Sequence, residues 1–232
     1  MPARLTIRRL AAFILPIGLA FAASAQARTD HDGQAWINVT VTGTVTGRLL
    51  YFAEVQPRFD DNVSHLGTAI VRGAIGWKLS PSLSLHQGFA HIASPVEDGR
   101  DVNEERSFQQ LNWTIGHPGG GELSSRTRLE QRWRSDGSDV GWRLREMLRY
   151  ERPLPYGKNL NLLGYAEIFA ALNDTDWGAR AGFDQLRSFA GFEIPLAGKS
   201  TVELGYLNHY VNQSGGRRRL NHVASLSLFL RP

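Results

Sequence analysis

The chain of 232 residues contains no cysteine. This absence excludes a disulfide framework, and it excludes the lipid-modified cysteine that would anchor a bacterial lipoprotein. The mature chain also lacks long apolar runs, and it lacks any segment with a helical apolar period long enough to cover a sheet. A fold built around helices is therefore not expected, and the remaining patterns indicate an all-β protein.

The N-terminus carries the one continuous apolar stretch, residues 10–23, and three arginines precede it: Arg4, Arg8 and Arg9. Two small-residue triplets follow, ending at Ala25 and at Ala27. A basic region, a short apolar core and small residues are the parts of a secretory signal peptide. The stretch is short and contains Pro16, so a permanent membrane helix is the weaker alternative. We predict a cleaved signal peptide over residues 1–27 and one domain over residues 28–232.

The formal charge gives little support for nucleic-acid binding. It is +4 for the whole chain and falls to +1 once the three leader arginines are removed. The other arginines alternate along apparent strands instead of clustering with exposed aromatic residues, so we expect no nucleic-acid partner.

Residues 121–152 show the strongest pattern, a strict alternation of polar and apolar side chains in two segments joined by a polar turn at residues 135–139. A period of two is typical of extended strands, because successive side chains leave opposite faces of a sheet. The polar parity is dominated by charged residues: Arg126, Arg128, Glu130, Arg132, Arg134, Arg143, Arg145, Arg149 and Glu151. The pattern predicts an antiparallel hairpin with one highly charged face.

A soluble sheet would need a second layer over its apolar face, which leaves a β-sandwich as the soluble alternative. A closed barrel in a membrane satisfies both faces, with apolar side chains toward lipid and polar ones toward the lumen. We predict a single antiparallel, up-and-down transmembrane β-barrel of ten to twelve strands. Eleven strand-like runs can be counted, whereas bacterial barrels have even strand numbers. Either a weak twelfth strand lies near residues 30–34, or one run does not join the barrel.

Several segments follow one another in an order that resembles a known family. They are Arg126-Thr-Arg128-Leu-Glu130-Gln-Arg132, Trp142-Arg-Leu-Arg145, Tyr165-Ala-Glu167-Ile-Phe169, Phe183-Asp-Gln-Leu-Arg187 and Leu204-Gly-Tyr206-Leu-Asn208. So arranged, the chain resembles the bacterial outer-membrane barrels catalogued as domain of unknown function 2490. The resemblance implies a Gram-negative outer-membrane barrel with no established activity. The ending departs from the usual terminal aromatic residue, because Phe229 is followed by Leu230-Arg231-Pro232.

An outer-membrane lipid-hydrolysing enzyme, a phospholipase or lipid A deacylase, is the alternative function. Such a barrel would need a serine activated by a histidine, two positions apart on one strand face. The nearest candidate is His209, but the second position after it is Val211, and Ser214 lies beyond the expected strand end. We therefore predict no catalytic residues and no enzyme activity.

No metal or cofactor site is expected either. The seven histidines, at positions 31, 65, 86, 91, 117, 209 and 222, show no spacing typical of metal ligands. The acidic loop expected over residues 95–105 contains Asp98, Asp101, Glu104 and Glu105. It could attract a divalent cation or lipopolysaccharide-bound calcium, although a solvated acidic loop is the simpler interpretation.

The charged residues that we expect to face the lumen are Glu54, Arg126, Arg128, Glu130, Arg132, Arg143, Arg145, Arg149, Glu151, Glu167 and Arg187. They form either a structural ion-pair network or a positive wall that lines a narrow, porin-like passage for small anionic solutes. The parity of Glu146 places it on the lipid face, and the sequence offers no account of it beyond a membrane edge or a protomer contact. Expected partners are outer-membrane lipid, lipopolysaccharide and the barrel-insertion machinery.

Overall fold

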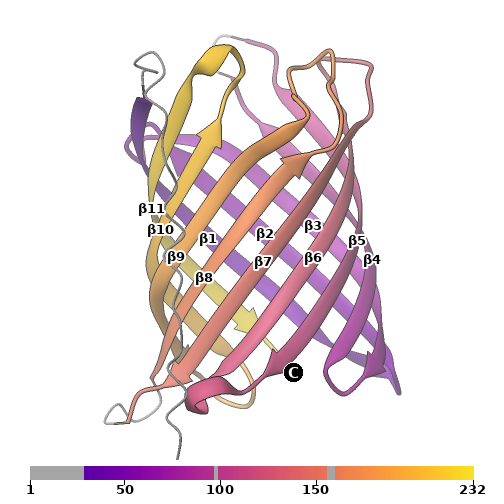
Figure 1. Cartoon of the computed structure of the whole chain (residues 1–232), viewed down its shortest axis with the longest axis vertical. Coiled ribbons are helices and arrows are strands. Elements are labelled where there is room, and N and C mark those ends of the chain that lie inside the picture. Colours follow the sequence, from indigo (N-terminus) through magenta and orange to yellow (C-terminus); the bar gives the residue numbers. More distant parts are fainter. Residues whose placement is uncertain (1–28, 97–98, 156–159) are drawn as a thin grey trace, which may run out of the picture.

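A computed structural model describes residues 29–96, 99–155 and 160–232. The expected signal peptide, residues 1–27, lies outside these described residues. Eleven strands account for most of the described chain (Figure 1). Their bounds are β1 Thr29–Thr46, β2 Leu49–Asp60, β3 His65–Ser80, β4 Leu83–Ser94, β5 Val102–Gly116, β6 Glu122–Arg134, β7 Gly141–Pro153, β8 Asn161–Ala171, β9 Gly182–Pro195, β10 Thr201–Asn212 and β11 Arg218–Leu230.

Two short 3₁₀ turns, η1 Pro118–Gly120 and η2 Ser214–Gly216, complete the described elements. Within the described part of the chain, no helix is long and apolar enough to cross a membrane.

The strands close into a barrel in which each strand pairs with its neighbours in sequence, and β1 pairs with β11. The predicted all-β closed barrel of ten to twelve strands is thereby confirmed. Both explanations offered for the odd count were wrong, because all eleven runs join the barrel and residues 30–34 are part of β1. The barrel is also not antiparallel throughout. In an up-and-down order an odd count points the first and last strands the same way, so β1 and β11 pair in parallel from Thr29↔Arg218 to Val41↔Leu230.

The two rims of the barrel differ in their connections. The C-terminal rim, where β11 ends, carries two-residue turns between β1 and β2 and between β3 and β4, together with three connections of five to seven residues. The opposite rim carries the ten-residue connection between β8 and β9 (Figure 1). β1 begins at this opposite rim, so the two ends of the described barrel lie at different rims.

The turn between β2 and β3 has an unusual backbone. Asp61, Asn62 and Val63 all have positive φ, at 50°, 54° and 70°. Their conformation is supported from β1, because Asp32 accepts hydrogen bonds from the backbone N–H groups of Asp61 and Asn62 at 3.4 and 3.1 Å. A β-branched residue such as Val63 is strained at positive φ.

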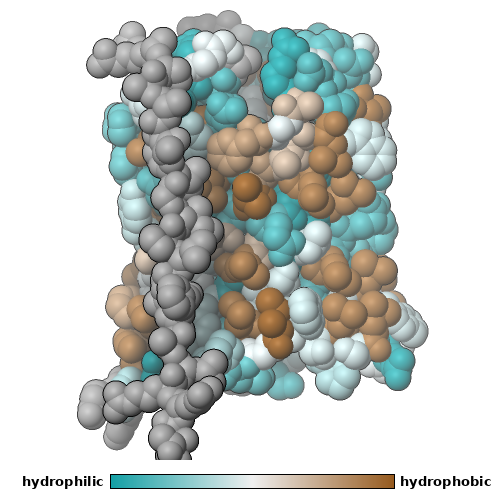
Figure 2. All heavy atoms as spheres, viewed as in Figure 1, coloured by the Kyte–Doolittle hydropathy of each residue, from teal (hydrophilic) through white to brown (hydrophobic). Residues whose placement is uncertain are grey.

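Large apolar side chains cover much of the outer surface of the barrel (Figure 2). Four of the six tryptophans belong to this surface and lie near strand ends. Trp77 and Trp113 are close to the C-terminal rim, and Trp133 and Trp142 are close to the opposite rim; each is 39–50% exposed. The apolar exterior is therefore bordered by tryptophan at both rims.

The interior is filled unevenly. Toward the rim where β1 begins, Ile70, Ala90, Ile92 and Phe108 form a buried apolar cluster between β3, β4 and β5. Gly88 is required there, because a Cβ atom at this position would collide with the Phe108 ring. On the other side of the lumen, Trp36, Leu163, Phe189, Leu207 and Val223 form a second buried cluster.

Candidate functional site

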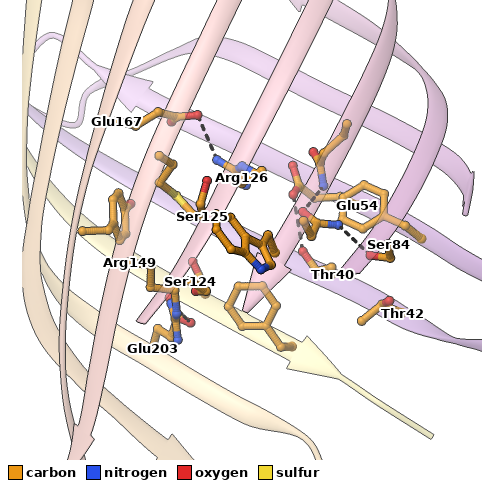
Figure 3. Close-up of a pocket in the computed structure, with 18 of the residues that line it drawn as sticks. Thr40, Thr42, Glu54, Ser84, Ser124, Ser125, Arg126, Arg149, Glu167 and Glu203 are labelled. Carbon is orange, nitrogen blue, oxygen red and sulfur yellow. Dashed lines mark hydrogen bonds and ion pairs between the residues drawn. The ribbon is translucent and has the colours of Figure 1, made fainter. Parts of the chain in front are cut away.

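The charged interior of the barrel is the candidate site. Buried apolar and charged side chains fill the half toward the start of β1, while the other half contains a cavity of about 740 Å³. Residues of the β3–β4 turn and Arg231 line this cavity at the C-terminal rim, and Trp36, Arg58 and Arg145 line its inner end. The cavity is therefore a cup with its mouth at the C-terminal rim and its floor at these inner residues. We refer to it as the cup (Figure 3).

Glu130 of β6 is the centre of the network behind the floor. Its side chain is 1% exposed, and its carboxylate lies 2.6 Å from Arg143, 2.7 Å from Arg145 and 3.7 Å from Arg128. Arg143 continues the network to Asp184 of β9 at 3.3 Å. Register explains this convergence, because Glu130 and Arg143 are direct partners in the β6–β7 ladder and Arg128 is opposite Arg145.

Glu167 of β8 is the second shared carboxylate. It lies 2.7 Å from Arg145, 2.9 Å from Arg126 and 3.7 Å from Arg187. Figure 3 shows Arg126 reaching from β6 toward Glu167 across the wall of the cup. Arg145 contacts both shared carboxylates and so joins them into one network across β6, β7 and β8.

Aromatic rings fill the space between the guanidinium groups. Phe169 is fully buried, and the guanidinium carbons of Arg143, Arg145 and Arg187 lie 4.4–5.3 Å from its ring centre. Arg128 lies over Phe108 in the same way at 4.4 Å. Cation–π contact stabilises arginine where water is excluded.

Two further clusters lie on either side of this network. Toward the rim where β1 begins, Glu104 lies 2.5 Å from Arg132 and 2.7 Å from Arg106. Near the cup mouth, Arg149 lies 2.6–3.1 Å from three carboxylates, those of Glu151, Glu193 and Glu203. Arg149 and Glu203 are both seen in Figure 3.

The expected lumen residues belong to these clusters, except for Glu54. It pairs with Arg72 of the neighbouring strand β3 at 3.1 Å. Sequence reasoning did not select Arg58, Arg72, Glu193 and Glu203 as site residues. The alternation of side chains along their strands could have identified them, because each lies on the same strand face as an expected lumen residue or another polar residue.

The acidic loop was predicted incorrectly. β5 begins at Val102, so Glu104 and Glu105 belong to a strand and face opposite sides of the barrel wall. Glu104 faces inward to two arginines, whereas Glu105 faces outward to His91 at 2.6 Å. Asp101 accepts a hydrogen bond from the backbone of Val96, and Asp98 lies outside the described residues. No group of three or more metal-ligating side chains is present among the described residues.

His209 faces the interior of the barrel. It is 7% exposed, and its ring nitrogens lie 3.0 Å from Gln185 and 3.2 Å from Asn221. The Trp36 ring packs against it edge-on at 5.3 Å. Both polar partners of the histidine are amides, and an amide cannot serve as the nucleophile of an acyl-transfer reaction.

Glu146 is on the outer face of β7, as its parity indicated, and it is half-buried. Its carboxylate accepts hydrogen bonds from the hydroxyls of Ser125 and Thr127, both at 2.5 Å. The two hydroxyls of β6 thus supply the partners that the sequence did not reveal.

Asp176 links two loops at the rim where β1 begins. Asp176, between β8 and β9, accepts hydrogen bonds from the backbone N–H and the hydroxyl of Ser138 at 2.8 Å. These bonds hold the pKa of Asp176 below its usual value of 3.8, with the backbone bond contributing most. Trp177 adds a hydrogen bond to the carbonyl of Asp139, so the two loops form one lid-like layer above Arg132 and Arg134.

Comparison with known proteins places the chain in a family. The model of a family described as "Protein of unknown function (DUF2490)" matches residues 33–221. An uncharacterised protein of Methylorubrum extorquens is 50% identical over 215 residues, which cover 92% of this chain and 93% of the relative. No solved structure matches the chain. The match spans the barrel from early β1 to β11, and the chain therefore belongs to the DUF2490 family of proteins of unknown function.

Proposed function

We propose that this protein is an outer-membrane β-barrel whose lumen is closed at mid-height by an arginine–glutamate network, so that it does not conduct ions. The outward apolar side chains and the tryptophans at both rims support the membrane placement, because aromatic residues are enriched at the two membrane interfaces. Trp113 is opposite Ser125 on β6, and Trp133 is eight residues further along that strand. At about 3.3 Å per residue this is about 26 Å along a tilted strand, which suits a thin outer membrane.

The C-terminal rim faces the periplasm in this proposal. Short periplasmic turns and longer outer loops are typical of outer-membrane barrels. The shortest connections and the end of β11 share one rim, and the longest connection belongs to the other. The cup would then open to the periplasm, while the packed half would face the cell exterior. Lipopolysaccharide and the barrel-insertion machinery would be partners of any such barrel.

The dense packing around Glu130 is the observation that best supports the proposal of a closed lumen. The side chains of Glu130, Glu167, Arg128, Arg143 and Arg145 are each only 1–4% exposed. A conducting passage would hydrate these groups, as the polar interior of a porin is hydrated. Guanidinium groups stacked on Phe108 and Phe169 fill the remaining space. The network is thus better suited to joining the strands than to passing solutes.

Membrane placement is tested by cell fractionation and by gel mobility. The mature protein, beginning after Ala25 or Ala27, should fractionate with outer membrane and should migrate differently before and after heating. Recovery as a soluble periplasmic protein would refute the proposal.

The closed lumen is tested by conductance in a planar bilayer. The wild type should conduct little, and Arg128→Glu together with Arg145→Glu should destabilise the barrel, because these changes place acids beside Glu130. The matched control is Arg152→Glu at the end of β7, outside both shared-carboxylate clusters. Steady wild-type conductance that prefers anions, and that loses this preference in the double variant, would establish the anion passage in place of the closed barrel.

A further inference from the structure

The floor of the cup carries more positive charge than its acids can neutralise. Five arginines line its inner end: Arg58, Arg72, Arg126, Arg145 and Arg187. The glutamates beside them are Glu54 and Glu167, and Glu130 contacts Arg145 from behind the floor. A confined excess of this kind attracts an anion.

Hydrogen bonding at the floor is also incomplete. The Nε atoms of Arg58, Arg126 and Arg187 are buried and donate to no acceptor among the described residues, while that of Arg72 lies 3.1 Å from the carboxylate of Glu54. Arg58 donates one hydrogen bond, to Gln56 at 2.8 Å, and Arg187 approaches a carboxylate only at 3.7 Å. Because a guanidinium group offers five N–H donors, most of the donor capacity of these two residues is not used by the part of the chain that the structure describes.

Trp36 holds the two most weakly paired arginines together. The guanidinium carbon of Arg58 lies 3.8 Å from the Trp36 ring centre, and that of Arg187 lies 4.9 Å from it. Trp36 is itself fixed by a hydrogen bond from its indole N–H to Gln34 at 2.9 Å. Two planar forks therefore converge on one rigid ring at the floor of a water-accessible cavity. Fork-shaped donors match the paired oxygens of carboxylate and phosphate groups.

We propose that the cup is a binding site for a small molecule bearing a phosphate or carboxylate group, which enters from the C-terminal rim and binds on Arg58 and Arg187. The cavity volume of about 740 Å³ lies within the range of small-molecule sites. The walls add hydroxyl and amide groups from Asn38, Thr40, Ser84, Asn112, Ser124 and Ser227, which suit a polar ligand body. This inference rests on the proposed barrel and its inward arginines, and it does not require that the lumen be closed to ions.

Calorimetric titration of the purified barrel in a non-ionic detergent tests the site, with glycerol 3-phosphate as the soluble probe and dihexanoyl phosphatidic acid as the lipid probe. We expect saturable binding of one molecule per barrel to at least one probe. Arg58→Met together with Arg187→Met should weaken binding by about tenfold to a hundredfold, since charge-assisted hydrogen bonds have that weight. The control Lys78→Met removes a charge that lines the cup away from the floor, and it should weaken binding less than about threefold.

Thermal unfolding of the wild type with and without the probe gives a second measurement of binding. A bound anion should raise the unfolding temperature of the wild type, whereas sodium chloride of equal ionic strength should not. The Arg58→Met, Arg187→Met barrel should retain its heat-modifiable mobility and lose this response.

The site would be refuted if neither probe binds to the wild type, or if the double variant binds as the wild type does. Binding of only one probe would support the oxyanion site and would show whether its ligand is a soluble molecule or a lipid. A barrel that conducts but binds a probe would refute the closed lumen and leave the site standing, whereas a silent barrel that binds neither probe would do the reverse.

Discussion

Replacing Glu130 with glutamine tests whether the network stabilises the barrel. The substitution keeps the shape of the side chain and removes one negative charge that lies within 3.7 Å of Arg128, Arg143 and Arg145. Glu130 is 1% exposed, so little water can replace the lost charge. Three guanidinium groups would then repel one another, with Glu167 still contacting Arg145 and Asp184 still contacting Arg143.

The size of the effect follows from the geometry. Two unit charges about 4 Å apart interact by about 4 kcal/mol at an effective dielectric constant of about 20, and relaxation of the network reduces the net loss. Removing one partner of a buried ion pair generally costs about 3–5 kcal/mol, and we expect Glu130→Gln to lower the free energy of unfolding by that amount. The control is Glu105→Gln on the outer face, where the side chains of Glu105 and His91 are 42% and 49% exposed. Its cost should be about 0–1 kcal/mol.

Guanidinium-induced unfolding in lipid vesicles, followed by tryptophan fluorescence, measures both variants. The midpoint should fall for Glu130→Gln, while the dependence on denaturant concentration stays unchanged. Adding Arg143→Met to Glu130→Gln should recover part of the loss, because it removes one of the uncompensated charges. A loss for Glu130→Gln below about 1 kcal/mol, or equal to that of Glu105→Gln, would refute the assignment of a stabilising network.

Three further predictions concern the turns, the outer face and the loops. Val63→Gly should raise the free energy of unfolding by about 1 kcal/mol, because glycine adopts the φ of 70° without strain; an equal gain from Val63→Ala would contradict this explanation. Glu146→Leu should stabilise the barrel in lipid vesicles by up to about 2 kcal/mol, because it removes a carboxylate from the outer face. A loss of stability in vesicles would indicate that a partner covers the carboxylate. The contact of Asp176 with Ser138 should persist above pH 3.8 and be lost as the pH falls through the lowered pKa of Asp176. The reason is that the hydrogen bonds from Ser138 stabilise only the ionised carboxylate. Amide hydrogen exchange at Ser138 measures this contact, and Asp176→Asn should make the exchange independent of pH once the intrinsic rate is divided out.

The alternation of side chains predicted most of the fold because a period of two needs no knowledge of the tertiary structure. It assigned a face to each residue of the hairpin, including Glu146, whose outward position the structure bears out. The parity of a residue does not show where its strand begins or ends, however. Glu104 and Asp101 are only three residues apart, yet one is in the lumen and the other in a loop, because the strand boundary lies between them.

Pairing partners could not be predicted for a related reason. A residue in a lumen can contact any strand that its side chain reaches, and the choice depends on the stagger of the strands around the barrel. Glu54 selects Arg72 on the adjacent strand, whereas Arg149 reaches Glu193 and Glu203 on strands β9 and β10. The parallel seam was missed because family regularities favour even strand counts, and no local pattern records how a sheet closes.

The parallel seam between β1 and β11 also makes this barrel resistant to circular permutation. Leu230 is opposite Val41, and Thr29 is twelve residues further along the seam, so a peptide joining the two ends would have to span about 40 Å. Its route would lead either through the lumen, where Glu130 and its arginines fill the space, or along the apolar exterior. A barrel with an even number of strands can be rejoined across one rim by a few residues. Here the covalent order of the strands is tied to the way the sheet closes, because new termini would require a linker that runs the length of the seam.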